Sequence, residues 1–274
     1  MGLPSLVAYH RAASVGRNSV RPIGGVPVTR HVLVVADSLA FHGPARPEVP
    51  GDPRLWPNVM AAALAAASDA AVEAHLVARP GWTSRDAWWA LTKDPNIWGA
   101  ELPRADAVVF GVGGMDQLPA AVPTYLREGI AFVRPGSLRR QIRQRYLAAA
   151  PHVMRATGGP FRQLPQSATD RYLSRCVEAV RFVRPTAPLA VLGPAPFRAA
   201  AYPALHGHAA AVHAARRWAI ATNVALVEPS RHILPTFRDG SCNPDGMHWA
   251  WSVHDAVGRD FAAALLAQGF AAGD

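Results

Sequence analysis

Short runs of apolar residues recur along the chain, and each is followed by a turn and then by a longer stretch rich in alanine or in alternating polar residues. The first run, HVLVVAD at 31–37, places no polar residue between His31 and Asp37. Such a run is typical of a strand buried on both faces of a parallel sheet. Strands are predicted at residues 31–37, 72–78, 105–113, 187–194 and 223–229.

The stretches between and after these runs have the composition and length of helices. Helices are predicted at residues 55–68, 84–93, 204–222 and 249–268. Alternating strands and helices predict an α/β fold: a three-layer α/β/α sandwich with a central parallel sheet of about five strands, of the flavodoxin-like type. Ligands bind such sheets at the carboxyl ends of the strands, so function is expected there.

Two segments depart from the alternation. Residues 1–29 carry Gly, Pro, Ser and scattered Arg without a period, and are predicted to be a flexible lead-in to a single domain at 30–274. Residues 133–168 contain a basic helical pattern followed by a Gly/Pro break. We interpret this second segment as a helical insertion over the ligand-binding edge of the sheet.

The charge is strongly basic, and it is almost entirely arginine. Hydrophobic residues make up 50% of the chain, the formal net charge is +9, and Lys93 is the only lysine. A GC-rich genome explains such a composition, and so does binding of anionic ligands such as phosphates or carboxylates. A basic nucleic-acid-binding protein is a further alternative, but no nucleic-acid motif is present and the arginines are interleaved with proline and aliphatic residues.

The two cysteines, Cys176 and Cys242, have no spacing typical of a zinc site, so we expect no metal. A disulfide between them stays an open alternative, because the sequence does not determine their redox state. Cys176 lies in a helical pattern and is predicted to be a buried small hydrophobe. The N-terminus lacks the apolar core of a signal peptide, and no later stretch reaches the roughly 18 apolar residues of a membrane span. A cytoplasmic location is expected.

Two sequence features carry candidate chemistry. Ser38 directly follows the first strand, where a serine is placed for nucleophilic attack, although many such serines only cap helices. Near the chain end, Asp245 precedes His248 by three residues, a spacing at which a carboxylate can orient an imidazole. A solvated loop histidine is the commoner case, but the two features together are far more specific.

The Asp-Ser-Leu block at 37–39 and the Asp-x-x-His block at 245–248 resemble the first and last blocks of the SGNH (GDSL-type) hydrolases. This resemblance spans residues 31 to about 268. It implies a catalytic triad of Ser38, Asp245 and His248. It also implies an oxyanion hole formed by backbone N–H groups of Ser38, Gly81 and Gly114, because Gly81 follows the second strand and Gly113-Gly114-Met115-Asp116 follows the third.

Two positions depart from the family pattern. Ala36 replaces a glycine, a small change at a strand end, and Met115 replaces the asparagine whose amide donates to the oxyanion. Losing one such donor typically costs roughly 100- to 1,000-fold in turnover. Either a backbone N–H of the Gly113-Gly114 pair supplies the hydrogen bond, or turnover is slow, or the site has lost catalysis.

The strings at 32–44, 52–58 and 245–251 resemble a narrower group within that family, the mycobacterial diglucosylglycerate octanoyltransferases. The resemblance implies transfer of an octanoyl group from acyl-CoA, a co-substrate, to a hydroxyl of diglucosylglycerate in methylglucose lipopolysaccharide biosynthesis, with no cofactor. Both substrates are anionic, which suits arginines of the insertion. The predicted substrate-binding residues are Asp37, Met115, Asp116, Arg139, Arg143 and Trp249.

Three other functions compete with this one. An SGNH esterase or thioesterase on the same triad would use water as the acceptor, and a nucleic-acid-binding protein would use the basic charge alone. A dinucleotide-binding loop at 111–116 fails because Asp116 stands where the third glycine is needed. We expect small-molecule partners, no nucleic acid and no membrane span; the sequence does not determine the oligomeric state.

Overall fold

The central sheet of the computed structural model has strand order β1-β3-β2-β4-β7-β8. The structure describes residues 10–11, 29–68, 70–203 and 207–272. The parallel strands are β2 (Thr29–Ala36), β3 (Ala71–Ala78), β4 (Ala107–Gly111), β7 (Leu189–Leu192) and β8 (Ala225–Val227). This arrangement confirms the predicted five-stranded parallel sheet.

Strand β2 is buried on both faces, as its apolar run predicts. No residue from Val32 to Ala36 is more than 1% exposed. Val32 and Val34 pack in the cluster on one face of the sheet, whereas Leu33 and Val35 pack in the cluster on the other. Because side chains of a strand alternate between faces, the uninterrupted apolar run follows from helices on both sides.

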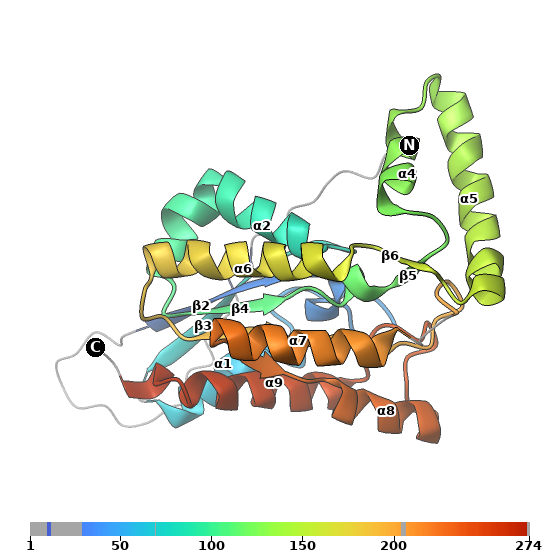
Figure 1. Ribbon diagram of the computed structural model, residues 1–274. Coiled ribbons are helices and arrows are strands. Elements are labelled where there is room, and N and C mark those ends of the chain that lie inside the picture. The colour runs from blue at the N-terminus through green and yellow to red at the C-terminus, as the bar shows by residue number, and fades with distance from the viewer. Residues whose placement is uncertain (1–9, 12–28, 69, 204–206, 273–274) are drawn as a thin grey trace, which may run out of the picture.

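Helices cover each face of the sheet (Figure 1). One face packs against α1 (Trp56–Ala67), α8 (Ser230–Asp239) and α9 (Trp251–Leu266). The other packs against α2 (Ser84–Lys93), α6 (Gln166–Val183) and α7 (His208–Thr222). Shorter elements are the 3-10 turns Ser38–Ala40, Met115–Gln117 and Phe270–Ala272, the π-turn Ile97–Glu101 and α3 (Leu102–Arg104).

The insertion forms an arm. It comprises β5 (Pro119–Ala120), α4 (Thr124–Gly129), the 3-10 turn Ile130–Phe132, α5 (Gly136–Thr157) and β6 (Phe161–Arg162). The basic helix is present as predicted, but α4 and α5 stand away from the layers instead of covering the edge of the sheet (Figure 1). Of α5 only Ala150 and Met154 are buried, so the helix has little apolar surface to hold it against the body.

Several elements differ from the prediction. Helix α8, which contains Pro235, was not predicted, and α6 was predicted only as a helical pattern around Cys176, without bounds. Within the predicted lead-in, His10–Arg11 forms β1, which pairs antiparallel with β3, and Thr29 already belongs to β2. The rest of that lead-in lies outside the described residues, so its flexibility stays a prediction.

The strand order brings the ends of β2 and β4 side by side. The chain runs from β2 outward to β3 and then returns to the other side of β2 as β4. At such a reversal the loops after the two central strands diverge and leave a crevice. Ser38 follows β2 and Gly113-Gly114 follows β4, so the topology places them together at this edge.

Three sequence-level expectations concern the whole fold. Cys176 is fully buried, as predicted, and both cysteines are free. None of the described helices combines the length and apolarity needed to cross a bilayer. Among the described residues, no group of three or more His, Cys, Asp or Glu side chains is placed to bind a metal ion.

Candidate active site

Ser38 is held by a tight turn at the end of β2. The Asp37 carboxylate accepts from the Leu39 N–H (2.9 Å) and caps the 3-10 turn that begins at Ser38. The Ser38 carbonyl accepts from the His42 N–H (2.9 Å), and the Asp37 N–H donates to the carbonyl of Gly111 at the end of β4 (3.3 Å). The backbone on either side of the serine is therefore fixed to both central strands.

The loop before α9 presents an imidazole to this serine. Asp245 accepts from the backbone N–H groups of Met247 (2.8 Å) and His248 (3.0 Å) through one oxygen, and from His248 Nδ1–H (2.5 Å) through the other. With the proton on Nδ1, Nε2 accepts from the Ser38 hydroxyl at 3.1 Å across 210 residues of sequence. Ser38, His248 and Asp245 thus form the hydrogen-bonded chain that the sequence analysis predicted.

The electrostatics of this chain favour a neutral imidazole beside an ionised carboxylate. Burial would raise the pKa of Asp245, but the hydrogen bonds from His248 and from two backbone N–H groups outweigh it and hold that pKa below its usual value. For His248, burial lowers the pKa below 6.5, and the neighbouring His42 lowers it further against the opposing effect of Asp245. A neutral imidazole is the form that can accept a proton from Ser38.

Two further histidines, His42 and His254, lie near His248, and neither was predicted to have a role. The ring of His42 stacks on that of His248, with centroids 3.5 Å apart and planes 13° from parallel. His42 Nδ1–H donates to the Gly43 carbonyl (2.7 Å). His254 is fully buried between the backbone of Trp56 and the His42 carbonyl, and burial lowers its pKa to about 4. The stacked His42 ring therefore restricts the orientation of the His248 ring.

A small apolar pocket opens at Ser38, which we call the nucleophile pocket. It has a volume of about 30 Å³. Its walls include Ser38 and His248 together with the apolar side chains of Leu39, Met115, Leu118, Phe197 and Met247. An apolar wall beside a nucleophile suits the first carbons of an acyl chain.

The oxyanion hole stays a prediction. Gly114, one predicted donor, lines the nucleophile pocket with Ser38 and Met115. Gly81 follows β3 with a φ of +74°, and a Cβ at Gly81 would lie 3.8 Å from the terminal methyl of Met115. The Met115 side chain thus lies close to Gly81 and lines the nucleophile pocket beside Gly114, and its thioether supplies no hydrogen.

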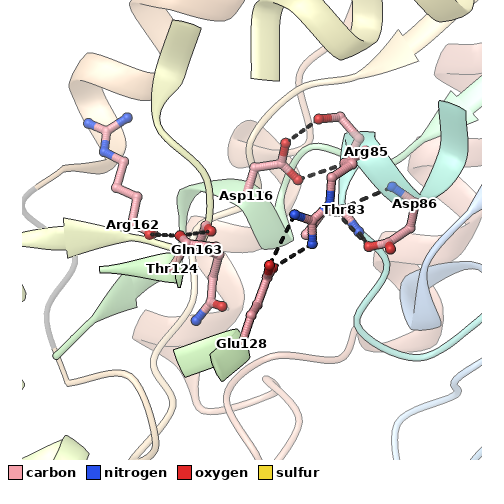
Figure 2. A network of polar contacts seen from close by, with 9 residues as sticks. Thr83, Arg85, Asp86, Asp116, Thr124, Glu128, Arg162 and Gln163 are labelled. Atoms are coloured by element: carbon pink, nitrogen blue, oxygen red, sulfur yellow. Dashed lines mark hydrogen bonds and ion pairs between the residues drawn. The ribbon is translucent and has the colours of Figure 1, made fainter. Parts of the chain in front are cut away.

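Asp116 is a structural residue and not a substrate contact, which corrects the sequence-based assignment. It is fully buried, and its carboxylate accepts from the Ser84 N–H (2.9 Å) and hydroxyl (2.5 Å), which ties the loop after β4 to the start of α2 (Figure 2). Burial raises the pKa of Asp116, and it raises that of Asp37 to about 7. Asp37 lines the nucleophile pocket, but its carboxylate is engaged by the Leu39 N–H.

Three other predicted substrate-binding residues lie away from the nucleophile pocket. Trp249 is 2% exposed and packs against His254, so it belongs to the core. Arg139 and Arg143 lie on α5, the helix of the arm that stands away from the sheet, and neither lines the nucleophile pocket. The sequence pattern predicts that these two arginines lie on a helix, but it does not predict the direction in which that helix runs.

Comparisons with known proteins bear on this geometry. No protein-family model matches the sequence. Diglucosylglycerate octanoyltransferases from Mycolicibacterium hassiacum and Mycobacterium tuberculosis are each 41% identical to this chain over 239 residues. The alignments cover 87% of this chain and 95% and 93% of the two relatives.

Solved structures show a similar fold at low identity. A lipase/acylhydrolase from Enterococcus faecalis has a TM-score of 0.55 and 15% identity, with 85% of this chain and 94% of that chain covered. A lipolytic protein of the G-D-S-L family from Desulfitobacterium hafniense has a TM-score of 0.53 and 11% identity, with 86% and 99% covered. These likenesses support the fold and carry nothing about the substrate.

Proposed function

Because the chain belongs to the diglucosylglycerate octanoyltransferase family of SGNH-type enzymes, we propose that it transfers an octanoyl group from octanoyl-CoA to a hydroxyl of diglucosylglycerate. The observation that carries the chemistry is the hydrogen-bonded chain from Ser38 through His248 to Asp245. We place the reaction in the cytoplasm, in methylglucose lipopolysaccharide biosynthesis.

In the first half-reaction, His248 Nε2 takes the Ser38 proton as Oγ attacks the thioester carbonyl. Backbone N–H groups of Ser38, Gly81 and Gly114 hold the oxyanion in this proposal. When the C–S bond breaks, the proton on His248 passes to the CoA sulfur, and Ser38 carries the octanoyl ester. Asp245 stabilises the imidazolium that forms between these two transfers.

In the second half-reaction, the acceptor hydroxyl takes the place of CoA. His248 removes its proton, the hydroxyl oxygen attacks the Ser38 ester, and the proton returns to Ser38 Oγ as that ester bond breaks. The products are the octanoylated acceptor and the free enzyme. Water in place of the acceptor gives hydrolysis, which is the reaction of the esterase alternative.

The first test follows both half-reactions. Purified protein is incubated with octanoyl-CoA, with and without diglucosylglycerate, while free thiol and intact protein mass are measured. We expect an octanoyl adduct without acceptor and faster CoA release with acceptor.

The Ser38→Ala variant removes the nucleophile, so adduct and transfer should both be lost. Ser252→Ala, at an exposed position of α9, is the matched control and should behave as the wild type. If CoA release is rapid and its rate does not depend on diglucosylglycerate, the protein is a thioesterase. Normal transfer by Ser38→Ala would exclude an acyl-enzyme on Ser38.

A further inference from the structure

A larger, polar cavity adjoins the nucleophile pocket. It has a volume of about 200 Å³, and the two share Gly114, Ala195 and Phe197 in their walls. Its polar side chains come from Gln117, Arg162 and His208. We call it the polar cavity, in contrast to the apolar nucleophile pocket.

Arg162 is held firmly at the base of the arm. It lies on β6, opposite Pro119 of β5. Its carbonyl accepts from the Thr124 hydroxyl at 3.3 Å (Figure 2). The N–H of the next residue, Gln163, donates to the Leu118 carbonyl (3.0 Å). The arginine side chain therefore starts from a fixed backbone.

Within the described part of the chain, the guanidinium of Arg162 donates hydrogen bonds only to uncharged acceptors. Nη1 donates to the side-chain oxygens of Gln117 and Gln166, the latter at 3.2 Å, and Nη2 donates to the Gly207 carbonyl (3.4 Å). Amide and carbonyl oxygens orient a guanidinium without neutralising it. The cavity wall thus presents a full positive charge.

The nearby carboxylates are engaged elsewhere. Glu128 accepts from Arg85 (2.5 Å), Asp116 accepts from Ser84, and Asp170 accepts from the Gln166 amide (2.7 Å). Figure 2 shows the Arg162 side chain directed away from Asp116 and Glu128. His208, in the same cavity, has its pKa lowered by burial and so adds no charge near neutral pH.

Among the described residues, none accepts from the hydrogens on one edge of the Arg162 guanidinium. The bonds to described residues use two N–H groups of Nη1 and one of Nη2, out of five donors. Nε–H and the second Nη2–H donate to no described residue. These two groups can donate two parallel hydrogen bonds to a carboxylate or phosphate. Gly207 lacks a side chain beside this edge, where a Cβ would lie 3.4 Å from Nη2.

We propose that the polar cavity is the acceptor subsite and that Arg162 binds the carboxylate of the acceptor, so that a hydroxyl faces the acyl group on Ser38. This inference rests on the proposed function. It adds Arg162 as the residue that makes the enzyme select an acceptor with a carboxylate. A phosphate of the acyl donor has the same oxyanion chemistry, so the experiment must separate the two substrates.

The test compares Arg162→Gln with the wild type in three assays. Ser38 acylation is followed with octanoyl-CoA alone and with p-nitrophenyl octanoate alone, and transfer is followed with diglucosylglycerate and with its carboxamide. Losing a hydrogen-bonded charge partner should raise the KM for diglucosylglycerate roughly 10- to 100-fold. Acylation should be unchanged, and the preference for acid over amide should disappear.

Two further variants separate charge, geometry and fold. Arg162→Lys keeps the charge without the two-pronged edge, so its KM should fall between the wild type and Arg162→Gln. Arg171→Gln, at an exposed position of α6, removes the same charge outside the cavity and should match the wild type. Normal acylation by p-nitrophenyl octanoate shows that each variant is folded.

Three outcomes contradict the inference. Retained acid preference in Arg162→Gln excludes the carboxylate contact. Slower acylation by octanoyl-CoA, with normal acylation by p-nitrophenyl octanoate, assigns the anion to the donor phosphate. A wild type that acylates Ser38 but does not transfer to diglucosylglycerate has a different acceptor, so the proposed function fails and the inference fails with it.

Discussion

The His248 imidazole is subject to opposing effects at the scale of single residues. Burial and the stacked His42 ring lower its pKa, whereas the hydrogen bond to Asp245 raises it. The lowered pKa leaves His248 able to accept a proton at neutral pH, and in the proposed reaction Asp245 stabilises the cation that forms. His42 thus acts as a positioning residue with an electrostatic effect, and this is testable.

The acylation rate should fall with pH as His248 becomes protonated. Because its pKa lies below 6.5, the neutral form dominates at pH 7, and the rate should drop only below pH 6.5. The rate of thiol release from octanoyl-CoA between pH 4.5 and 8 measures this acid limb. In His42→Phe, which keeps a stacking ring without a titratable group, the limb should move to higher pH.

An acid limb above pH 6.5 in the wild type would contradict the pKa direction of His248. An unchanged limb in His42→Phe, with an unchanged rate at pH 8, would reduce His42 to a packing residue. His42→Ala, which removes the ring altogether, should lower the rate at pH 8 because His248 loses the surface that fixes its plane.

At the scale of elements, two loops cooperate to hold the triad. The Arg198 N–H, in the loop after β7, donates to the Gly246 carbonyl between Asp245 and His248 (2.7 Å). Gly246 has a φ of +67°, and a Cβ there would lie 2.1 Å from the Arg198 carbonyl oxygen. The loop therefore needs glycine for both its conformation and this close approach.

Gly246→Ala should displace the catalytic loop. Gly240→Ala is the matched control, because Gly240 has a φ of +77° but no atom within 4 Å of its Cβ position. The control should lose about 1–2 kcal/mol of unfolding free energy through backbone strain. The clash at Gly246 should add about 1–3 kcal/mol and reduce acylation roughly 100-fold, since small displacements of catalytic groups are costly.

Urea unfolding and the acylation rate measure the two effects separately. Equal loss of stability in the two variants, with normal acylation in Gly246→Ala, would show that the loop relaxes without moving Asp245 or His248.

At the scale of the whole molecule, the chain has a formal net charge of +9, and its site is proposed to bind two anionic substrates. A field of this sign raises the local concentration of anions and speeds their association. Salt screens it, because the Debye length is roughly 10 Å at 0.1 M and roughly 3 Å at 1 M. The arm contributes arginines to this field without touching the nucleophile pocket.

The KM for octanoyl-CoA should therefore rise severalfold between low and high ionic strength. p-Nitrophenyl octanoate has the same acyl group and no phosphate, so its KM should stay nearly constant. Steady-state kinetics from about 0.02 to 0.5 M NaCl compare the two donors. A parallel rise for both would assign the salt effect to the fold or to the acyl pocket instead of to the phosphates.

The sequence alone determined the layers of the fold. A strand buried on both faces must be apolar throughout, so β2, β4 and β7 are visible as apolar runs, and parallel strands put their following loops at one edge. The spacing of Asp245 and His248 predicts their contact with each other. The approach of His248 to Ser38 was implied by the resemblance to the SGNH hydrolases, and the structure shows the hydrogen bond. Helix α8 was not predicted, and α6 was recognised only around Cys176, because no comparable apolar or alanine-rich run marks either helix.

Only the tertiary structure decided which side chains face the site. It stacked His42 on His248, buried Asp116 and Trp249, turned the arm with Arg139 and Arg143 away, and brought Arg162 to a cavity beside Ser38. These positions depend on the directions of elements and on contacts between distant segments. Hydrophobic periodicity indicates which positions of an element face the core, but not which other segment packs against them. For that reason the sequence pattern could not predict these side-chain positions.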